Sequence, residues 1–261
     1  MRSLSIAATG MLAQQLNVEV ISNNIANMNT TGFKRQRAEF QDLLYQSQRR
    51  VGSTASDAGT VVPAGVQIGL GVKTAAVYTI NEQGNLQSTE NPLDLAISGN
   101  GFFQITLPSG DTAYTRAGSF QLSSTGQLVT VDGNIVEPAI TVPANTLQIT
   151  VNASGQVLAQ VAGSVAETVV GQLQLANFAN PAGLDPVGDN LFLETTASGS
   201  ATTGNPGVTG LGTMIQGFLE TSNVNTVSEI TNLITAQRAY EMNSKVIQTS
   251  DEMLSTITRM R

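Results

Sequence analysis

The sequence contains no cysteine and no histidine. Without cysteine, disulfides, thiolate catalysis and zinc–sulfur sites are excluded. Without histidine, a Ser-His-Asp triad, a histidine-ligated metal and a histidine general base are excluded as well. We therefore expect a protein that is not an enzyme and that uses no cofactor, no metal and no small-molecule substrate.

Charge is also scarce. Only 12% of the 261 residues are charged, and 12 Lys and Arg stand against 19 Asp and Glu, which gives a net charge of −7 at pH 7. Proteins that bind nucleic acid usually carry a basic tract that contacts the phosphates. The acidic balance and the lack of such a tract argue against nucleic acid as a partner.

Long apolar runs are missing too. A membrane-spanning helix needs about 20 apolar residues, and no run of this sequence approaches that length. The start of the chain makes a poor secretory signal, because Arg2 is the only early positive charge and Gly10, Gln14, Gln15 and Asn17 interrupt the apolar stretch. If the protein leaves the cytoplasm, we expect a route that needs no cleaved signal peptide.

Two long helices are predicted, one at each end of the chain. Residues 3 to about 28 have helical periodicity, and residues 226–261 contain neither glycine nor proline. A helix of the latter length would be about 54 Å long, which is typical of a coiled coil or of the wall of a tube. Each segment carries a stripe at intervals of three and four residues, as helices with a helical partner do. The stripes are Leu4, Ala8, Met11, Gln15, Val18, Ser22 and Ile25, and Leu233, Ala236, Tyr240, Asn243, Ile247, Ser250, Leu254 and Ile257.

We predict that these stripes form contacts between copies of the chain. Some stripe positions are polar, which weakens an isolated pair of helices, whereas many shallow contacts in a lattice tolerate them better. The alternative is that the two helices only close the core of one domain. The predicted subunit-interface residues are Leu4, Ala8, Met11, Val18, Ile25, Leu233, Ala236, Tyr240, Ile247, Leu254 and Ile257.

The middle of the chain is predicted to be a β-rich body. Apolar residues alternate at 93–97, 103–107, 147–151 and 157–161, and turn-forming residues stand at 108–111, 124–126, 132–134 and 153–155. Two stretches, 46–71 and 195–212, are rich in Gly, Ser, Thr and Ala, and they are predicted to be loops or to be ordered only by contact. The predicted class is therefore α+β, with a discontinuous domain of paired, coiled-coil-like terminal helices and a β-rich body.

Three local patterns suggest other chemistry. Residues 69–74 (GLGVKT) resemble a phosphate loop, but Val72 separates the glycine from Lys73, so a turn that enters a strand is the better interpretation. Asp185 and Asp189 could hold calcium, although they lack the alternating oxygen ligands of an EF-hand and are more typical of a surface turn. A pair of glycosidase carboxylates could lie among Asp94, Asp111 and Asp132, yet all three stand beside turn residues, where Asp is expected anyway.

Several motifs resemble one known family, the rod and hook proteins of the bacterial flagellum. Residues 24–34 (NIANMNTTGFK) resemble its N-terminal signature, in which Asn27, Thr30, Gly32, Phe33 and Lys34 are the signature residues. Residues 91–97 (NPLDLAI), 99–103 (GNGFF) and 114–120 (YTRAGSF) resemble the start of its β domain. Residues 222–225 (SNVN) and 236–241 (AQRAYE) resemble its C-terminal signature. The likeness covers nearly the whole chain and is greatest for the members that form the distal rod.

The resemblance implies a structural subunit of the basal-body rod. Such proteins are exported unfolded through the flagellar export apparatus and form a hollow helical polymer that spans the periplasm and transmits torque from motor to hook. The implied partners are further copies of the chain and other rod, hook and ring proteins. Alternatives are a proximal rod or hook paralogue, a secreted β-rich binding module with a helical stalk, and a hydrolase with paired carboxylates.

The resemblance and the periodicity together suggest three regions. Residues 1–30 and 222–261 form the expected helical polymerisation domain, residues 31–75 a connecting segment, and residues 76–221 a β-rich outer domain. Within the connecting segment, the stretch from Tyr45 to Pro63 resembles one that the distal rod proteins carry, and we expect it to stiffen the rod by packing between subunits.

Overall fold

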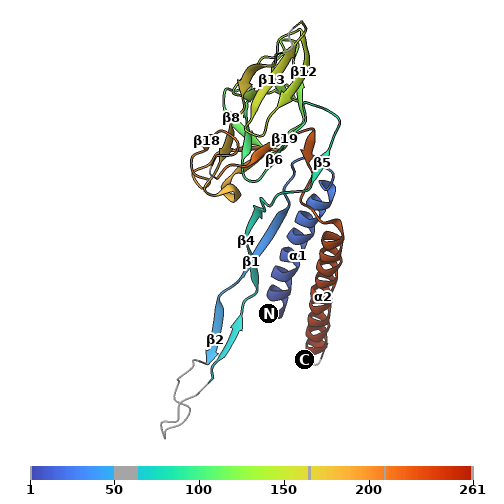
Figure 1. Ribbon diagram of the computed structural model, residues 1–261. Helices are drawn as coiled ribbons and strands as arrows, with labels where there is room; N and C mark the ends of the chain where they lie inside the picture. Colours follow the sequence, from blue (N-terminus) through green and yellow to red (C-terminus); the bar gives the residue numbers. More distant parts are fainter. Residues whose placement is uncertain (1, 50–63, 164–165, 209, 260–261) are drawn as a thin grey trace. The chain divides into compact units, whose positions relative to one another are not determined.

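The computed structural model describes residues 2–49, 64–163, 166–208 and 210–259. This part of the chain folds into two long α-helices and twenty strands, which confirms the predicted α+β class. It divides into two compact units (Figure 1). The helical unit comprises residues 1–25, 36–78 and 226–261, and the β unit comprises residues 26–35 and 79–225.

The helical unit contains both predicted helices, α1 (Arg2–Ala26) and α2 (Thr226–Arg259). It also contains four strands from the expected connecting segment: β1 (Gln36–Asp42), β2 (Tyr45–Arg49), β3 (Val66–Gly69) and β4 (Val72–Thr79). β1 pairs with β4, and β2 pairs with β3 in antiparallel register. For residues 46–49 and 66–69 the loop interpretation is therefore wrong and the alternative, ordering by contact, applies, because the two segments pair through their backbones although every side chain of β2 is exposed. The proposed stiffening stretch from Tyr45 to Pro63 is described only as far as Arg49, and its remainder lies outside the described residues.

The two helices run antiparallel, side by side (Figure 1). Three contacts define their register: the Nδ2 atom of Asn24 donates to Glu229 at 3.3 Å, Gly10 abuts Asn243, and the Ser3 and Ser250 hydroxyls lie 3.5 Å apart. A β-carbon on Gly10 would lie 2.9 Å from the Asn243 amide nitrogen, so the glycine allows the close approach of α2. Both sets of contact positions are separated by multiples of seven residues, which keeps one face of each helix toward the other.

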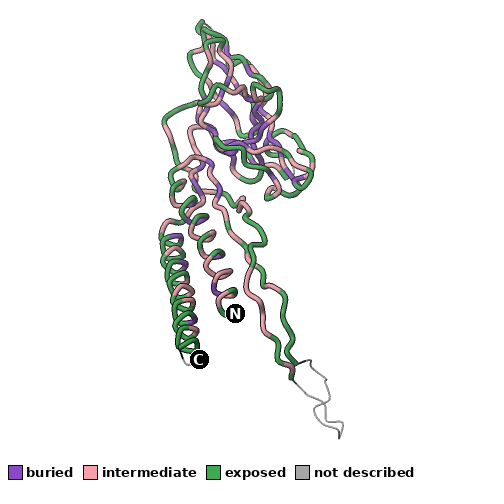
Figure 2. The backbone as a smooth tube through the Cα atoms, turned by 180° about the vertical axis from the view of Figure 1, so that it is seen from behind, coloured by how far each residue is buried: buried purple, intermediate pink, exposed green. Residues whose placement is uncertain are grey.

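The face of α1 that contacts α2 differs from the predicted stripe by one residue. The structural contacts use Ser3, Gly10 and Asn24, whereas the predicted stripe contains Leu4, Met11 and Ile25. On α2 the contacts to Asn243 and Ser250 fall within the predicted stripe. In Figure 2 buried and half-buried residues form a band along each helix, and the rest of α2 is exposed.

Asn24 connects three elements of the helical unit and is only 2% exposed. Its Nδ2 atom donates to the backbone oxygen of Gln36 at 2.8 Å, and its Oδ1 atom accepts from the backbone N–H of Gln36 at 2.8 Å. The same amide nitrogen donates to the buried Glu229 carboxylate. One side chain therefore joins α1, the first residue of β1 and the first turn of α2.

The β unit is built around a branched nine-stranded sheet. Its main path runs β16-β17-β8-β7-β11-β10-β9, and β15 pairs with both β7 and β18. The strands are β7 (Phe102–Thr106), β8 (Thr112–Thr115), β9 (Phe120–Leu122), β10 (Leu128–Thr130), β11 (Ile135–Glu137), β15 (Leu175–Asn177), β16 (Asp185–Gly188), β17 (Leu191–Leu193) and β18 (Thr202–Gly204). A short 3-10 helix (Pro181–Gly183) precedes β16. β18 lies in the stretch 195–212 that was predicted to be a loop or to be ordered only by contact. The loop interpretation is wrong for 202–204, where three residues pair with β15.

Three smaller sheets complete the β unit. β12 (Thr146–Val151), β13 (Gln156–Val161) and β14 (Thr168–Gln172) form one of them, β6 (Leu95–Ser98) pairs with β19 (Thr213–Gln216), and β5 (Leu86–Ser88) pairs with β20 (Phe218–Glu220). The predicted alternating segments correspond to β6, β7, β12 and β13, and the predicted turns connect β7 to β8, β9 to β10, β10 to β11 and β12 to β13. The main core contains buried residues from all these sheets except the β5–β20 pair; its largest members include Leu95, Ile97, Phe103, Phe120, Leu175 and Met214.

Replacing Asn24 by Ala should destabilise the helical unit by about 1 to 3 kcal/mol, because the Gln36 backbone groups and the Glu229 carboxylate lose a buried partner. The change should appear as faster amide hydrogen exchange in α1 and α2. The control is Ser22→Ala, which alters an exposed side chain of the same helix and should change stability by less than about 0.5 kcal/mol. Equal exchange rates in the two variants would contradict the role given to Asn24.

Candidate functional site

The most distinctive polar feature of the β unit is a buried cluster of three charges. The Glu220 carboxylate accepts from Lys34 Nζ through Oε1 at 2.5 Å and from Arg116 Nε through Oε2 at 2.5 Å. The three side chains are 1%, 2% and 5% exposed, respectively. We call these residues the charge cluster. In a chain with so few charged residues, three of them share one buried site.

Three distant parts of the sequence supply the charge cluster. Lys34 belongs to the segment that follows α1, Arg116 follows the last residue of β8, and Glu220 is the last residue of β20. The Lys34 ammonium also donates to the backbone oxygen of Glu82 at 2.7 Å. The cluster therefore fixes the N-terminal part, the first strands and the last strand of the β unit to one another.

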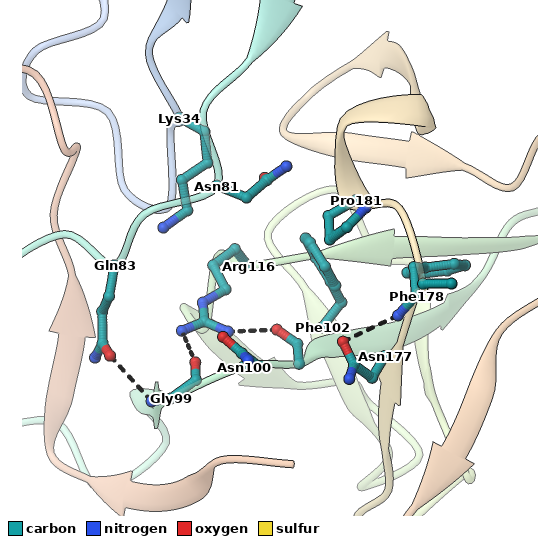
Figure 3. A pocket seen from close by; sticks show the side chains of 12 residues that line it. Lys34, Asn81, Gln83, Gly99, Asn100, Phe102, Arg116, Asn177, Phe178 and Pro181 are labelled. Atoms are coloured by element: carbon teal, nitrogen blue, oxygen red, sulfur yellow. Dashed lines mark hydrogen bonds between the residues drawn. The ribbon is translucent and has the colours of Figure 1, made fainter. Parts of the chain in front are cut away.

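Arg116 also organises the loop between β6 and β7. Its guanidinium donates to the backbone oxygens of Ile97 at 3.1 Å and Gly99 at 2.5 Å, and to that of Gly101. Figure 3 shows the contact between Arg116 and Gly99 at the wall of a hollow of about 300 Å³, with Lys34 and Asn81 on one side and Phe102, Phe178 and Pro181 on the other. The Arg116 donors are directed at protein oxygens, so the hollow gains no free positive charge from Arg116.

Glu220 is satisfied by backbone groups as well. Its Oε1 atom accepts from the backbone N–H of Gly84 at 2.8 Å, and its backbone oxygen accepts from the N–H of Gly32 at 2.8 Å. Three residues further on, the Asn223 side chain accepts from the backbone N–H of Arg35 at 2.7 Å and donates to the backbone oxygen of Ile80 at 2.9 Å. Residues 32–35, 80–84 and 220–223 are thus held together by charges and by hydrogen bonds.

The cluster shifts the pKa values of two members. Burial alone would raise the pKa of Glu220, but the charges of Arg116 and Lys34 outweigh burial and hold that pKa below its ordinary value of 4.5. Burial lowers the pKa of Lys34, and the neighbouring Glu220 offsets only part of this effect. Each charge of the cluster is paired with another charge of the same chain, so we interpret the cluster as a structural element of the β unit.

The signature residues lie at the start of the β unit. The Thr30 hydroxyl donates to the Asn27 side chain at 3.1 Å, and the backbone N–H of Phe33 donates to the Thr30 oxygen at 3.3 Å. Gly32 has a φ of 71°, and a β-carbon there would lie 2.6 Å from the backbone nitrogen of Ala117. Only glycine fits this position without strain. Phe33 is half-buried and Lys34 belongs to the charge cluster.

The predicted subunit-interface residues all lie on the helices and differ in exposure. Ala236 is buried, and Tyr240 and Ile257 are 44% and 61% exposed. The remaining members are half-buried within the chain: Leu4, Ala8, Met11, Val18, Ile25, Leu233, Ile247 and Leu254. The structure of one chain thus leaves part of each of these side chains accessible, except that of Ala236. Their contacts with other copies remain a prediction.

The residues of the three local patterns with alternative chemistry are exposed, lie in turns or form hydrogen bonds with nearby residues. Residues 69–74 include the turn between β3 and β4, as the simpler interpretation predicted. Asp185 and Asp189 are exposed, and Asp189 lies in the turn after β16 with a φ of 51°. Asp94 accepts hydrogen bonds from Thr89 and Asn91, and Asp111 accepts one from Ser109.

Across the described residues, no group of three or more acidic side chains is arranged to hold a metal ion. Neither helix in this part of the chain has the length and hydrophobicity of a membrane span.

Sequence reasoning missed Glu220. The residue stands directly after the apolar residues of β20, in a chain where charged residues are rare, and this isolated acid was the available signal. Its two cationic partners were both inside motifs that carried the family resemblance, Lys34 in residues 24–34 and Arg116 in residues 114–120. Nothing in the sequence indicates that these three residues meet.

Three family profiles match the chain. Residues 4–34 match a profile described as flagella basal body rod protein, residues 96–159 match the D1 domain of flagellar hook protein FlgE/F/G, and residues 215–260 match the C-terminal part of flagellar basal body rod FlgEFG protein. The matched regions include both helices, Lys34, Arg116 and Glu220.

Curated proteins are similar to the chain over its whole length. The flagellar basal-body rod protein FlgG of Caulobacter vibrioides is 60% identical over 261 residues, which are 100% of both chains. FlgG of Bacillus subtilis is 41% identical over 267 aligned residues, covering 100% of this chain and 99% of its own. The flagellar hook-basal body complex protein FlhP of Bacillus subtilis is 30% identical over 100% of both chains.

Replacing Glu220 by Gln should lower the free energy of unfolding of the β unit by about 3 to 5 kcal/mol, because two buried cations lose their counter-charge. Urea unfolding followed by amide exchange in β7 and β8 measures this loss. Glu82→Gln is the matched control, since the Glu82 side chain is 68% exposed in its pair with Arg35 and should contribute less than about 1 kcal/mol. A loss in Glu220→Gln no larger than in the control would refute the structural role of the cluster.

The stability of the β unit should fall at acid pH. The folded pKa of Glu220 lies below its ordinary value, so the ionised cluster contributes its full stability above about pH 4.5, and this contribution is lost as the pH falls through the folded pKa. Because the chain has no histidine, stability should stay nearly constant between about pH 5 and 8. Unfolding midpoints from pH 2 to 8 check both statements. In Glu220→Gln the acid-side loss should be smaller than in the unaltered chain.

Proposed function

Since this chain belongs to the family of flagellar basal-body rod proteins and is a structural subunit of the rod in the basal body of the bacterial flagellum, we propose that its copies assemble into the rod through helix–helix contacts. The observation that carries this proposal is an apolar face of α2 that is exposed in the single chain. It is formed by the exposed residues Met242, Val246, Met253 and Ile257 together with the half-buried Ala239. We call it the outer stripe.

The outer stripe has the spacing of a helix-packing face. Its members follow one another at intervals of three, four, seven and four residues, so they share one side of the helix. Met242, Met253 and Ile257 are 64%, 59% and 61% exposed. The face of α2 that contacts α1 contains Glu229, Asn243 and Ser250 instead. The chain thus uses small and polar residues for its internal helix contact and keeps larger apolar residues accessible.

Other exposed apolar residues of the helices support the same proposal. Val227, Ile230 and Ile234 are 76%, 45% and 46% exposed near the start of α2, and Leu12 is 67% exposed on α1. The helix α1 has only two charged residues, Arg2 and Glu19. A helix with so few charges can be enclosed by neighbouring helices without burying ions that lack a partner.

The finer features of the function follow from the family resemblance. The paired helices act as a coiled-coil-like polymerisation domain at the inner wall of a hollow tube, and the β unit lies outside it. The tube is the distal rod, which transmits torque from the motor to the hook. The chain works without catalysis.

The partners and the route follow from the same membership. The chain forms a homo-polymer and contacts other rod, hook and ring proteins. It leaves the cell interior unfolded through the flagellar export apparatus, without removal of a signal peptide, and reaches the rod in the periplasm.

Replacing Val246 by Asp should prevent assembly without unfolding the single chain. The side chain is 44% exposed, so the monomer should lose less than about 0.5 kcal/mol, whereas in the polymer the new charge would be buried without a partner. Electron microscopy of concentrated protein and motility of cells that carry the variant provide the two measurements.

The control for this experiment is Gln248→Asp. Gln248 is exposed two residues away on α2, outside the outer stripe, and it receives the same added charge. Tubes and motility should survive this change. If Val246→Asp also formed tubes and supported motility, the outer stripe would not be a subunit contact.

A further inference from the structure

The last part of the β unit, residues 211–223, contains the strands β19 and β20. β19 pairs with β6 from Thr213 to Gln216, and β20 pairs with β5 from Phe218 to Glu220. Among the strands that the structure describes, β6 has no sheet partner other than β19, and β5 has none other than β20. Two strands from the first half of the unit therefore depend on this segment for their backbone pairing.

The same segment completes the hydrophobic core. Met214 is 3% exposed within the main core, and Leu211 packs against that core. Leu95 and Ile97 of β6, which are 2% and 0% exposed, belong to the same core. Without residues 211–223, the core would lose its own members and the strand that holds β6 in place.

Polar contacts fasten the segment to three other parts of the unit. The Gln216 side chain donates to the backbone oxygens of Pro92 at 2.7 Å and Ile149 at 2.9 Å, and it accepts from the N–H of Val151 at 3.0 Å. These contacts occupy an edge of β12 that has no partner strand among the described residues. Near the end of the segment, Glu220 forms ion pairs with Lys34 and Arg116. The side chains of Lys34 and Arg116 are nearly inaccessible to solvent.

Removal of the segment would leave unfavourable groups in the unit. Lys34 and Arg116 would face each other without a counter-charge, and a buried cation without a partner is strongly destabilising. The backbone groups of β5 and β6 would lose the hydrogen bonds that β20 and β19 supply. Three of the four residues of β6 are buried, and buried backbone groups without partners are rare in folded proteins. The rest of the unit thus lacks a stable closed state of its own.

We propose that residues 211–223 are a closing segment, without which the β unit does not fold. Because a chain is synthesised from its N-terminus, the closing segment is the last part of the unit to become available. The β unit therefore stays open until its whole sequence is present. Under the proposed function the chain is exported unfolded, and late closure of the β unit helps to keep it unfolded until then. The folding test below does not depend on export.

The experiment cuts the folded full-length protein at one of two positions. In the first variant, a protease recognition sequence is inserted between Gly207 and Val208, which are both exposed, so that the cut releases the closing segment together with α2. In the second, the same sequence is inserted between Asn225 and Thr226, so that the cut releases α2 alone. After unfolding and separation of the pieces, refolding of the larger piece is followed by amide protection in β7, β8, β12 and β13.

The proposal expects the piece that ends at residue 225 to regain protection and the piece that ends at residue 207 to remain unprotected. Addition of the released piece should restore protection to the shorter one. Recovery of protection by the shorter piece alone would overturn the proposal. If the piece that ends at residue 225 did not regain protection, the proposal would be overturned too, because folding of the β unit would then require α2 rather than residues 211–223 alone.

A variant of the added piece tests Glu220 itself. With Glu220→Gln in the added piece, half-restoration of protection should need a concentration about a hundredfold to a thousandfold higher, since two buried cations stay unpaired. The matched change Glu252→Gln, at an exposed position of α2, should leave this concentration unchanged. Equal concentrations for the two variants would show that Glu220 does not fasten the segment.

Discussion

A buried carboxylate sets the arrangement of the β unit. An ionised side chain that is 1% exposed is strongly unfavourable unless cations and hydrogen-bond donors surround it. Glu220 has two cations, Lys34 and Arg116, and the backbone N–H of Gly84. These donors come from parts of the sequence that are far apart, so the carboxylate is satisfied in one arrangement only. The loop after β6, which Arg116 holds through three backbone oxygens, depends on the same arrangement.

In the helical unit, two helices pair while apolar side chains remain accessible. The contact between α1 and α2 uses Gly10, Asn243 and a pair of serines, and the amide of Asn24 ties both helices to β1. Small and polar residues suffice there because the hydrogen bonds of Asn24 are well formed and buried. The larger residues, such as Met242 and Met253, are consequently not needed within the chain. The apolar outer stripe of α2 therefore stays accessible for the assembly contacts proposed above.

The sequence predicted those features that depend on neighbouring residues. The two helices follow from periodicity and from the absence of glycine and proline after residue 226, and the hairpins follow from turn residues such as those at 132–134. Features that depend on distant residues were not predictable in the same way. The β2–β3 pair lies in a region that is poor in core-forming residues, and its strands are held by backbone pairing. The contact face of α1 was displaced by one residue, because the pattern favoured Leu4 and Met11 whereas the structure uses Ser3 and Gly10. The role of Glu220 was not predicted, because its partners Lys34 and Arg116 lie 186 and 104 residues away in the sequence.

The distribution of charge links these observations to function. A charge that is buried between the segments of one chain needs one set of partners, and the fold itself can supply that set. A charge at a contact that is repeated between copies would need a partner in every copy, at the cost of desolvation each time. The charge cluster lies inside the β unit, whereas α1 has only two charged residues and the outer stripe of α2 is apolar. Under the proposed function, electrostatics contributes to the unique fold of the β unit, and the helices associate through the outer stripe by apolar contacts, which are non-directional and tolerate the small adjustments that a polymer requires.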